Sequence, residues 1–189
     1  PFDPRLISRV SFAVAKAALD SGVAQRQIES FDKYKSQLKE RINPIASILE
    51  PIKRSITNKK KKVVFAEGES ENVIRAALTF YNSGFGFPIL IGRETIIKEN
   101  MKKLNLDGVE SLKIFNARIS NKNEQYISNL YSLLHRKGHL RRDCQKLVNQ
   151  DRNVFAASMV ASKDADAMVT GFTRPFNRCF DDIIKVIES

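Results

Sequence analysis

The chain has 189 residues, of which 42% are apolar, and a net charge of +11. This length and composition are typical of a soluble globular protein with one core, or with one domain and an appendage. No apolar run is long enough to span a membrane and the chain does not open on a secretory signal, so we expect a cytoplasmic protein without a membrane partner.

The first helix is predicted within residues 1–28, after a short loop. Its apolar residues recur at helical spacing, and Gly22 provides a natural stop. The recurring residues are Leu6, Val10, Ala13, Val14 and Ala17. Because this stripe has little core of its own, we expect it to pack against another part of a longer protein.

Residues 29–61 read as a basic helical connector. A polar helix is predicted from Ile28 to Ile42 and ends before Pro44, and a second short helix is predicted from Ala46 to Ile56. Residues 1–62 carry 14 Lys and Arg against 6 Asp and Glu, so most of the net positive charge lies in this part of the chain.

The lysine run that closes this connector, Lys59–Lys62, could bind a phosphate backbone. However, no aromatic residues alternate with these lysines, as they do on surfaces that bind single strands. We therefore expect a solvated linker and no nucleic acid partner, and we keep a nucleic-acid-binding domain as a rival interpretation.

From Lys62 onward, short apolar strands alternate with amphipathic helices. The predicted strands are Val63–Phe65, Phe87–Ile91, Ser111–Phe115 and Ala165–Val169. Ser70 is the predicted cap of the helix after the first strand, and its buried face is predicted as Val73, Ala77, Phe80 and Tyr81. Further helices are predicted from Asn121, which would cap its helix, from Leu140, from Asp151 and from Pro175. This alternation predicts an α/β fold with a mainly parallel sheet in three α/β/α layers.

The loops after the four strands hold the candidate binding residues. In a parallel sheet these loops meet at one edge, and arginine side chains there suit phosphate or carboxylate groups. The candidates for an anion or effector site are Arg93, Arg118, Thr170, Gly171, Thr173 and Arg174. A second interpretation, in which the arginines only solvate the edge of the sheet, stays open.

No catalytic residue and no metal site is predicted in this chain. Glu67 and Glu69 follow the first strand, and an electrostatic role at a helix start is favoured over acid–base chemistry. Cys144 and Cys179 lack the spacing of metal ligands and are predicted to be reduced, packed thiols. His135 and His139 are interpreted as surface residues near a helix end.

Three stretches resemble the phosphate acetyltransferase family, in the form fused to bacterial NADP-dependent malic enzymes. Lys62–Ala77, with the run KVVFAEGESENVIRAA, resembles the opening of that family. Phe87–Arg93 and Asp164–Gly171 match its next landmarks in order, and Pro1–Ile7 with Ala13–Ala24 resembles the end of the malic-enzyme portion.

The resemblance implies a division into three parts. Residues 1–28 would be the C-terminal helix of the NAD(P)-binding malic part, residues 29–61 the connector, and residues 62–189 the first half of a domain with the fold of phosphate acetyltransferase and isocitrate dehydrogenase. The parent enzyme would convert malate to pyruvate and CO2 with NADP and Mg²⁺ or Mn²⁺, while this segment would hold no cofactor. Its partners would be further copies of itself, the rest of the malic enzyme chain and an acetyl-CoA effector.

The resemblance also implies that this segment is regulatory and oligomerising and is not itself catalytic. The catalytic groups of both activities would lie outside residues 1–189, and Phe172 is bulkier than the small residues usual after the fourth strand. Two alternatives stay open beside nucleic acid binding: a fragment of an active phosphate acetyltransferase, and a purely structural oligomerisation domain with an empty crevice.

Overall fold

The computed structural model describes residues 4–28, 30–42, 52, 55–56, 60–104 and 112–187. The chain forms two compact units, Pro1–Ile56 and Thr57–Ser189. The predicted boundary of the α/β domain, at residue 62, lies close to the start of the second unit.

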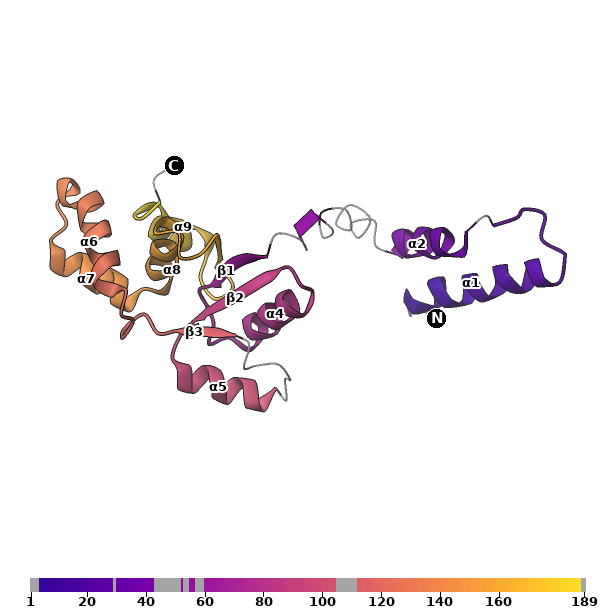
Figure 1. Cartoon of the computed structure of the whole chain (residues 1–189), viewed down its shortest axis with the longest axis horizontal. Coiled ribbons are helices and arrows are strands. Elements are labelled where there is room, and N and C mark those ends of the chain that lie inside the picture. Colours follow the sequence, from indigo (N-terminus) through magenta and orange to yellow (C-terminus); the bar gives the residue numbers. More distant parts are fainter. Residues whose placement is uncertain are drawn as a thin grey trace. The chain divides into compact units, whose positions relative to one another are not determined.

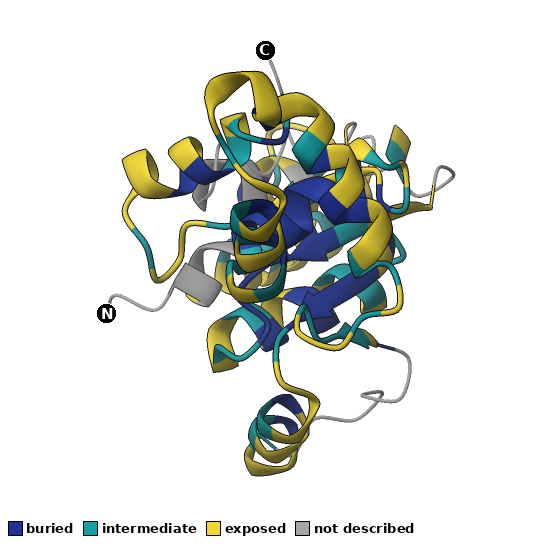
Figure 2. Ribbon diagram, turned by 90° about the vertical axis from the view of Figure 1, so that its left-hand side faces the viewer, coloured by how far each residue is buried: buried dark blue, intermediate teal, exposed yellow. Residues whose placement is uncertain are grey.

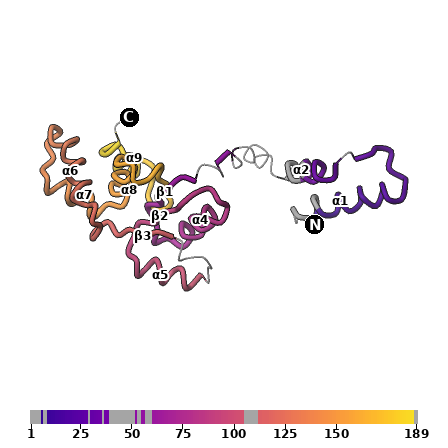
Figure 3. The backbone as a smooth tube through the Cα atoms, viewed as in Figure 1, coloured from indigo at the N-terminus to yellow at the C-terminus, as the bar shows by residue number. Residues whose placement is uncertain are grey.

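The first unit contains two helices that lie side by side, α1 (Pro4–Asp20) and α2 (Phe31–Ile42) (Figure 3). The rings of Phe12 and Phe31 join them edge to face, with centroids 5.5 Å apart. Both helices were predicted, although α2 begins three residues later than expected. Most of the predicted helix at residues 46–56, and the stop at Pro44, lie outside the described residues.

The second unit is built on a sheet of four strands, β1 (Lys61–Phe65), β2 (Gly86–Ile91), β3 (Lys113–Phe115) and β4 (Ala167–Val169) (Figure 1). The strand order is β3-β2-β1-β4 and every pairing is parallel. The predicted parallel α/β fold is therefore confirmed, and the carboxyl ends of all four strands meet at one edge.

Helices cover both faces of this sheet. They are α4 (Glu71–Asn82), α5 (Glu94–Lys103), α6 (Asn123–Leu134), the 3-10 turn η2 (His135–Lys137), α7 (Arg141–Gln150), α8 (Arg152–Ala161) and α9 (Phe176–Ile184). α4 and α5 pack on one face, and α6, α7 and α8 pack on the other, which completes the three predicted layers.

The alternation of side chains along the strands divides the core in two. Val64 and Ile89 point into the cluster beneath α6, α7 and α8, while Phe65 and Leu90 point into the cluster beneath α4 and α5. Figure 2 shows the buried residues gathered on the strands and on the inner faces of these helices. Both clusters lie within the second unit.

One predicted helix cap is confirmed in position only, and another is wrong. Ser70 does occupy the N-cap position of α4, but its side chain makes no capping hydrogen bond. The N-cap residue of α6 is Lys122, one position after the predicted cap Asn121, and the helix begins at Asn123. The reason is the turn before α6, where the Asn123 amide donates to the carbonyl of Ala117 at 2.6 Å and fixes the start of the helix.

The buried face of α4 also differs from the prediction. Ile74, Ala77 and Leu78 are buried, whereas Val73 and Tyr81 are only half-buried. Val73, Phe80 and Tyr81 pack against the edge of the buried cluster, so helical periodicity predicts the apolar stripe but not which of its residues are fully covered.

Cys144 and Cys179 are both buried and are not joined to each other. Among the described residues, no group of three or more His, Cys, Asp or Glu is placed to hold a metal ion. None of the described helices has the length and apolar character that crossing a bilayer requires.

Candidate anion-binding site

A cleft of about 340 Å³ lies at the carboxyl edge of the sheet. The loops after β2 and β3 form one side and the end of α7 with the start of α8 forms the other. Its polar lining residues are Glu69, Arg93, Asn116, Arg118, Asn149, Gln150, Arg152 and Arg174. We call this hollow the arginine cleft. Ligand crevices in parallel α/β sheets lie at this edge.

Arg93 is held at the rim of the arginine cleft by Glu69. The backbone N–H and the Nε of Arg93 both donate to Glu69 Oε1 at 2.9 Å, and its Nη2 donates to Oε2 at 3.0 Å. The hydrogen bonds from the Arg93 side chain and the charge of Arg93 outweigh burial and lower the pKa of Glu69. Since Arg93 is the N-cap residue of α5, Glu69 does act at a helix start, although at that of α5 and not α4.

Glu67, just after β1, binds the loop after β4. Its carboxylate, which is 2% exposed, accepts the backbone N–H groups of Phe172 at 2.7 Å and of Thr173 at 3.0 Å. It also accepts the Thr173 hydroxyl at 2.6 Å and Arg152 Nη2 at 3.0 Å. The predicted helix-start role is therefore wrong for Glu67, which binds a loop distant in sequence. Gly171, with a φ of +98°, makes the turn that presents both N–H groups.

These contacts shift the ionisation of Glu67. Burial alone would raise the pKa of its carboxyl group, but the hydrogen bonds from Thr173 and Phe172 and the charge of Arg152 lower the pKa overall. Glu67 is thus held as a carboxylate near neutral pH, and it balances the charge of Arg152.

Arg174 lies at the opposite wall, between Asp151 and Asp182. Its Nη1 donates to Asp151 Oδ2 at 2.7 Å and approaches Asp182 Oδ2 at 3.4 Å. Asp151 also caps α8, because its Oδ1 accepts the backbone N–H of Asn153 at 2.8 Å. Burial would raise the pKa of Asp151, but the hydrogen bond and charge of Arg174 together with the capping bonds lower it.

The structure brings three of the predicted residues together and separates the other three. Arg93, Arg118 and Arg174 line the arginine cleft. Thr170 and Gly171 line a different hollow, of about 440 Å³, beside Phe176 and Phe180 of α9, while Thr173 bonds to Glu67. The grouping differs from the prediction because the loop after β4 folds back over Glu67.

Arg152 lines the cleft but was not predicted from the sequence. It lies at the start of α8 and not after a strand, so only the packing of α8 against the sheet places it in the arginine cleft. The sequence signal that could have found it is the Asp151 cap, since the first turn of a helix that begins beside the sheet edge faces the crevice.

Unused donors remain in this cleft after the ion pairs are counted. The exposed Arg118 side chain has no hydrogen bond or ion pair among the described residues. Arg152 Nε is buried without a partner in the same part of the chain, and Arg174 uses only Nη1. A guanidinium carries five N–H donors, so this arrangement is suited to an anion with several oxygen atoms.

The profile of a family described as phosphate acetyl/butaryl transferase matches residues 47–189. The chain belongs to this family. It is 49% identical over 189 residues to a probable NADP-dependent malic enzyme of Rickettsia prowazekii, a match that covers 99% of this chain and 25% of the relative. It is 46% identical to an NADP-dependent malic enzyme of Rhizobium meliloti, over 100% of this chain and 25% of that relative.

The fold of the chain is also similar to that of solved phosphotransacetylase structures. A phosphotransacetylase from Streptococcus pyogenes superposes with a TM-score of 0.70 and 26% identity, over 76% of this chain and 43% of that chain. The resemblance to phosphate acetyltransferases in their malic-enzyme-linked form is therefore confirmed. The chain spans about a quarter of the length of the malic enzymes that it matches.

Proposed function

We propose that this chain is the transacetylase-like part of a cytoplasmic NADP-dependent malic enzyme. The parent would convert malate to pyruvate and CO2 with NADP and Mg²⁺ or Mn²⁺, and this part would regulate the enzyme and assemble its copies without catalysing a reaction. Support comes from the matches to two NADP-dependent malic enzymes along the whole of this chain.

The regulatory ligand that we propose is acetyl-CoA, with its phosphates in the arginine cleft. The observation that carries this proposal is the convergence of Arg93, Arg118, Arg152 and Arg174 on one hollow at the carboxyl edge of the sheet. Acetyl-CoA carries several phosphate oxygens, which match the planar forks of arginine. The description of the matching family and the name of the Streptococcus pyogenes phosphotransacetylase support an acetyl-bearing ligand.

Arg118 is the residue with which to test this site. Arg174 binds two carboxylates, so its loss would disturb α8 and α9 as well as any ligand. Replacing Arg118 breaks no side-chain hydrogen bond, ion pair or ring contact among the described residues. In the full-length enzyme, Arg118→Ala should weaken acetyl-CoA binding by about tenfold, the effect of losing one charge-assisted hydrogen bond pair.

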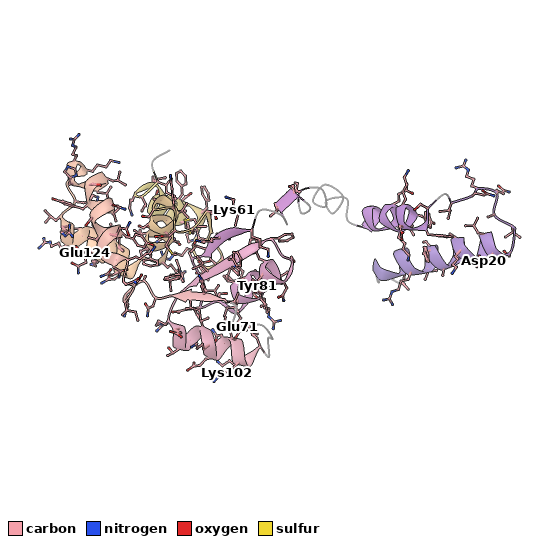
Figure 4. All side chains as sticks on the ribbon, in the orientation of Figure 1. Asp20, Lys61, Glu71, Tyr81, Lys102 and Glu124 are labelled. Carbon is pink, nitrogen blue, oxygen red and sulfur yellow. The ribbon has the colours of Figure 1, made fainter. Side chains whose placement is uncertain are left out.

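The measurement is calorimetric titration of acetyl-CoA into the full-length enzyme. Lys102→Ala removes the same charge from an exposed position on α5 (Figure 4) and serves as the control. Unchanged affinity in Arg118→Ala, or an equal loss in both variants, would rule out the arginine cleft. Light scattering of the same samples with and without acetyl-CoA would separate a sensor from a purely structural assembly domain.

A second candidate function is acetyl transfer itself. The likeness to the Streptococcus pyogenes phosphotransacetylase at a TM-score of 0.70 favours it. The two proposals differ in whether the chain catalyses a reaction. Under the first, we expect the purified 189-residue chain neither to oxidise malate nor to transfer an acetyl group from acetyl phosphate to CoA. Measurable acetyl-CoA formation above the rate of a heat-inactivated sample would replace the first proposal by the second.

A further inference from the structure

A second hollow, of about 400 Å³, lies in the second unit away from the arginine cleft. It opens beside the first residues of β2 and β3, on the sheet face that α6 and α8 cover. Ile89 and Met159 form its buried floor, and Phe87 and Phe115 form its walls. We call it the amino-edge groove.

The register of the strands explains why apolar side chains and lysines lie together in this groove. Lys62 pairs with Phe87, and Ile89 pairs with Lys113, in the parallel ladder. Alternate residues share a face, so Ile89 and Phe115 both face the cluster beneath α6 and α8. Phe87 shares that face yet is 46% exposed, which shows that the helices leave this end of the sheet uncovered.

Positive side chains surround the apolar floor. Lys62 and Lys113 are exposed at its rim, and Lys113 has no side-chain partner among the described residues. Lys122 also lines the groove but is paired with Asp164, whose other oxygen accepts the Tyr126 hydroxyl at 2.6 Å. The lining therefore carries three positive charges and one negative charge, and the negative charge is already engaged.

We propose that the amino-edge groove binds a carboxylate with an apolar tail. The tail would lie on Ile89, Phe115 and Met159, and the carboxylate would lie between Lys62 and Lys113. The volume is in the range of natural ligand sites, which combine an apolar lining with a few charged groups that fix orientation. This site is independent of the arginine cleft, because the two hollows share no lining residue.

The test is a titration of the 189-residue chain with octanoate, followed by ¹H–¹⁵N correlation spectra. We expect saturable shifts at the amides of Phe87, Ile89 and Phe115. Because 1-octanol has the same tail without the charge, it should bind at least about tenfold more weakly if the lysines contribute as close charge pairs. Comparable binding of 1-octanol, or no saturable shift at these amides, would overturn the proposal.

Charge reversal gives a second readout. Lys62→Glu combined with Lys113→Glu should weaken octanoate binding by about tenfold or more. Lys102→Glu combined with Lys103→Glu, on α5 at the other face of the sheet, reverses two exposed charges at a distance and should leave the affinity unchanged. An equal loss in both proteins would mean that octanoate responds only to the net charge of the chain, which contradicts a site in the groove.

Discussion

The carboxylate of Glu67 accepts hydrogen bonds from groups that lie 85 to 106 residues away in the sequence. Two are backbone N–H groups of the loop after β4, and one is the guanidinium of Arg152. A charge that is 2% exposed is tolerated only when such partners surround it. At the residue scale, this single side chain joins β1 to one wall of the arginine cleft.

Replacing this carboxylate should destabilise the fold. Glu67→Gln keeps the size of the side chain but leaves Arg152 without its compensating charge, and we expect a loss of about 3 kcal/mol in the free energy of unfolding. Urea denaturation followed by circular dichroism measures it. Glu71→Gln, the same change at an exposed position (Figure 4), should alter stability by less than about 0.5 kcal/mol. Equal effects of the two substitutions would contradict the role of Glu67.

Acid should weaken the same contacts. The folded pKa values of Glu67 and Asp151 are lower than their ordinary values, 4.5 and 3.8. A lowered carboxyl pKa stabilises the fold above the unfolded value, and this contribution disappears as pH falls through the folded value. The urea midpoint should therefore stay level from neutral pH down to the ordinary carboxyl pKa and fall below it. Glu67→Gln should show a shallower fall, and an identical pH profile would refute the assignment.

The sequence could predict that Arg93, Arg118 and Arg174 gather in one place, because each follows a strand and parallel strands end at one edge. It could not predict that Thr173 turns away onto Glu67, since that depends on how the loop after β4 folds back. The place of Arg152 in the arginine cleft could not be predicted from the sequence either. It lies at the start of a helix, and only the packing of α8 beside the sheet brings it to the cleft.

At the scale of elements, one residue at the start of α8 both stabilises the helix and holds an arginine of the cleft. Asp151 caps this helix through the N–H groups of Asn153 and Val154 and also binds Arg174. Ser70, by contrast, occupies the N-cap position of α4 without a side-chain hydrogen bond. The side chain of a serine or aspartate at an N-cap stabilises a helix by accepting a backbone N–H.

The two caps should therefore respond differently to alanine. Asp151→Ala should cost about 2 kcal/mol, because it removes the cap and one partner of Arg174, whereas Ser70→Ala should cost less than about 0.5 kcal/mol. Chemical denaturation of both variants under the same conditions gives the comparison. A loss in Ser70→Ala as large as that in Asp151→Ala would show that the capping geometry does not govern stability here.

The order of strands and helices in the second unit was predictable because each strand alternates with an amphipathic helix. Boundaries were less predictable: β1 begins two residues before the expected Val63, and β4 begins two after the expected Ala165. Pairing sets these ends, since Lys61 gains a strand partner in Gly86. The strand propensity of one segment does not show which residues of the neighbouring strand it will pair with.

At the scale of the whole molecule, both buried clusters lie within Thr57–Ser189. A unit with its own core can fold by itself. A chain that lacks residues 1–56 should therefore unfold in one cooperative transition and keep the circular dichroism of a helix-and-sheet protein. Loss of cooperativity in the shortened chain would show that the first unit is needed for the fold of the second.

We propose that the arginine cleft receives the phosphates of acetyl-CoA. The most direct measurement is a map of amide chemical shifts for the 189-residue chain titrated with acetyl-CoA. We predict saturable shifts at residues 92–93, 116–118 and 150–152, which diminish in Arg118→Ala. Shifts confined to other parts of the second unit, or none at saturating acetyl-CoA, would contradict the account.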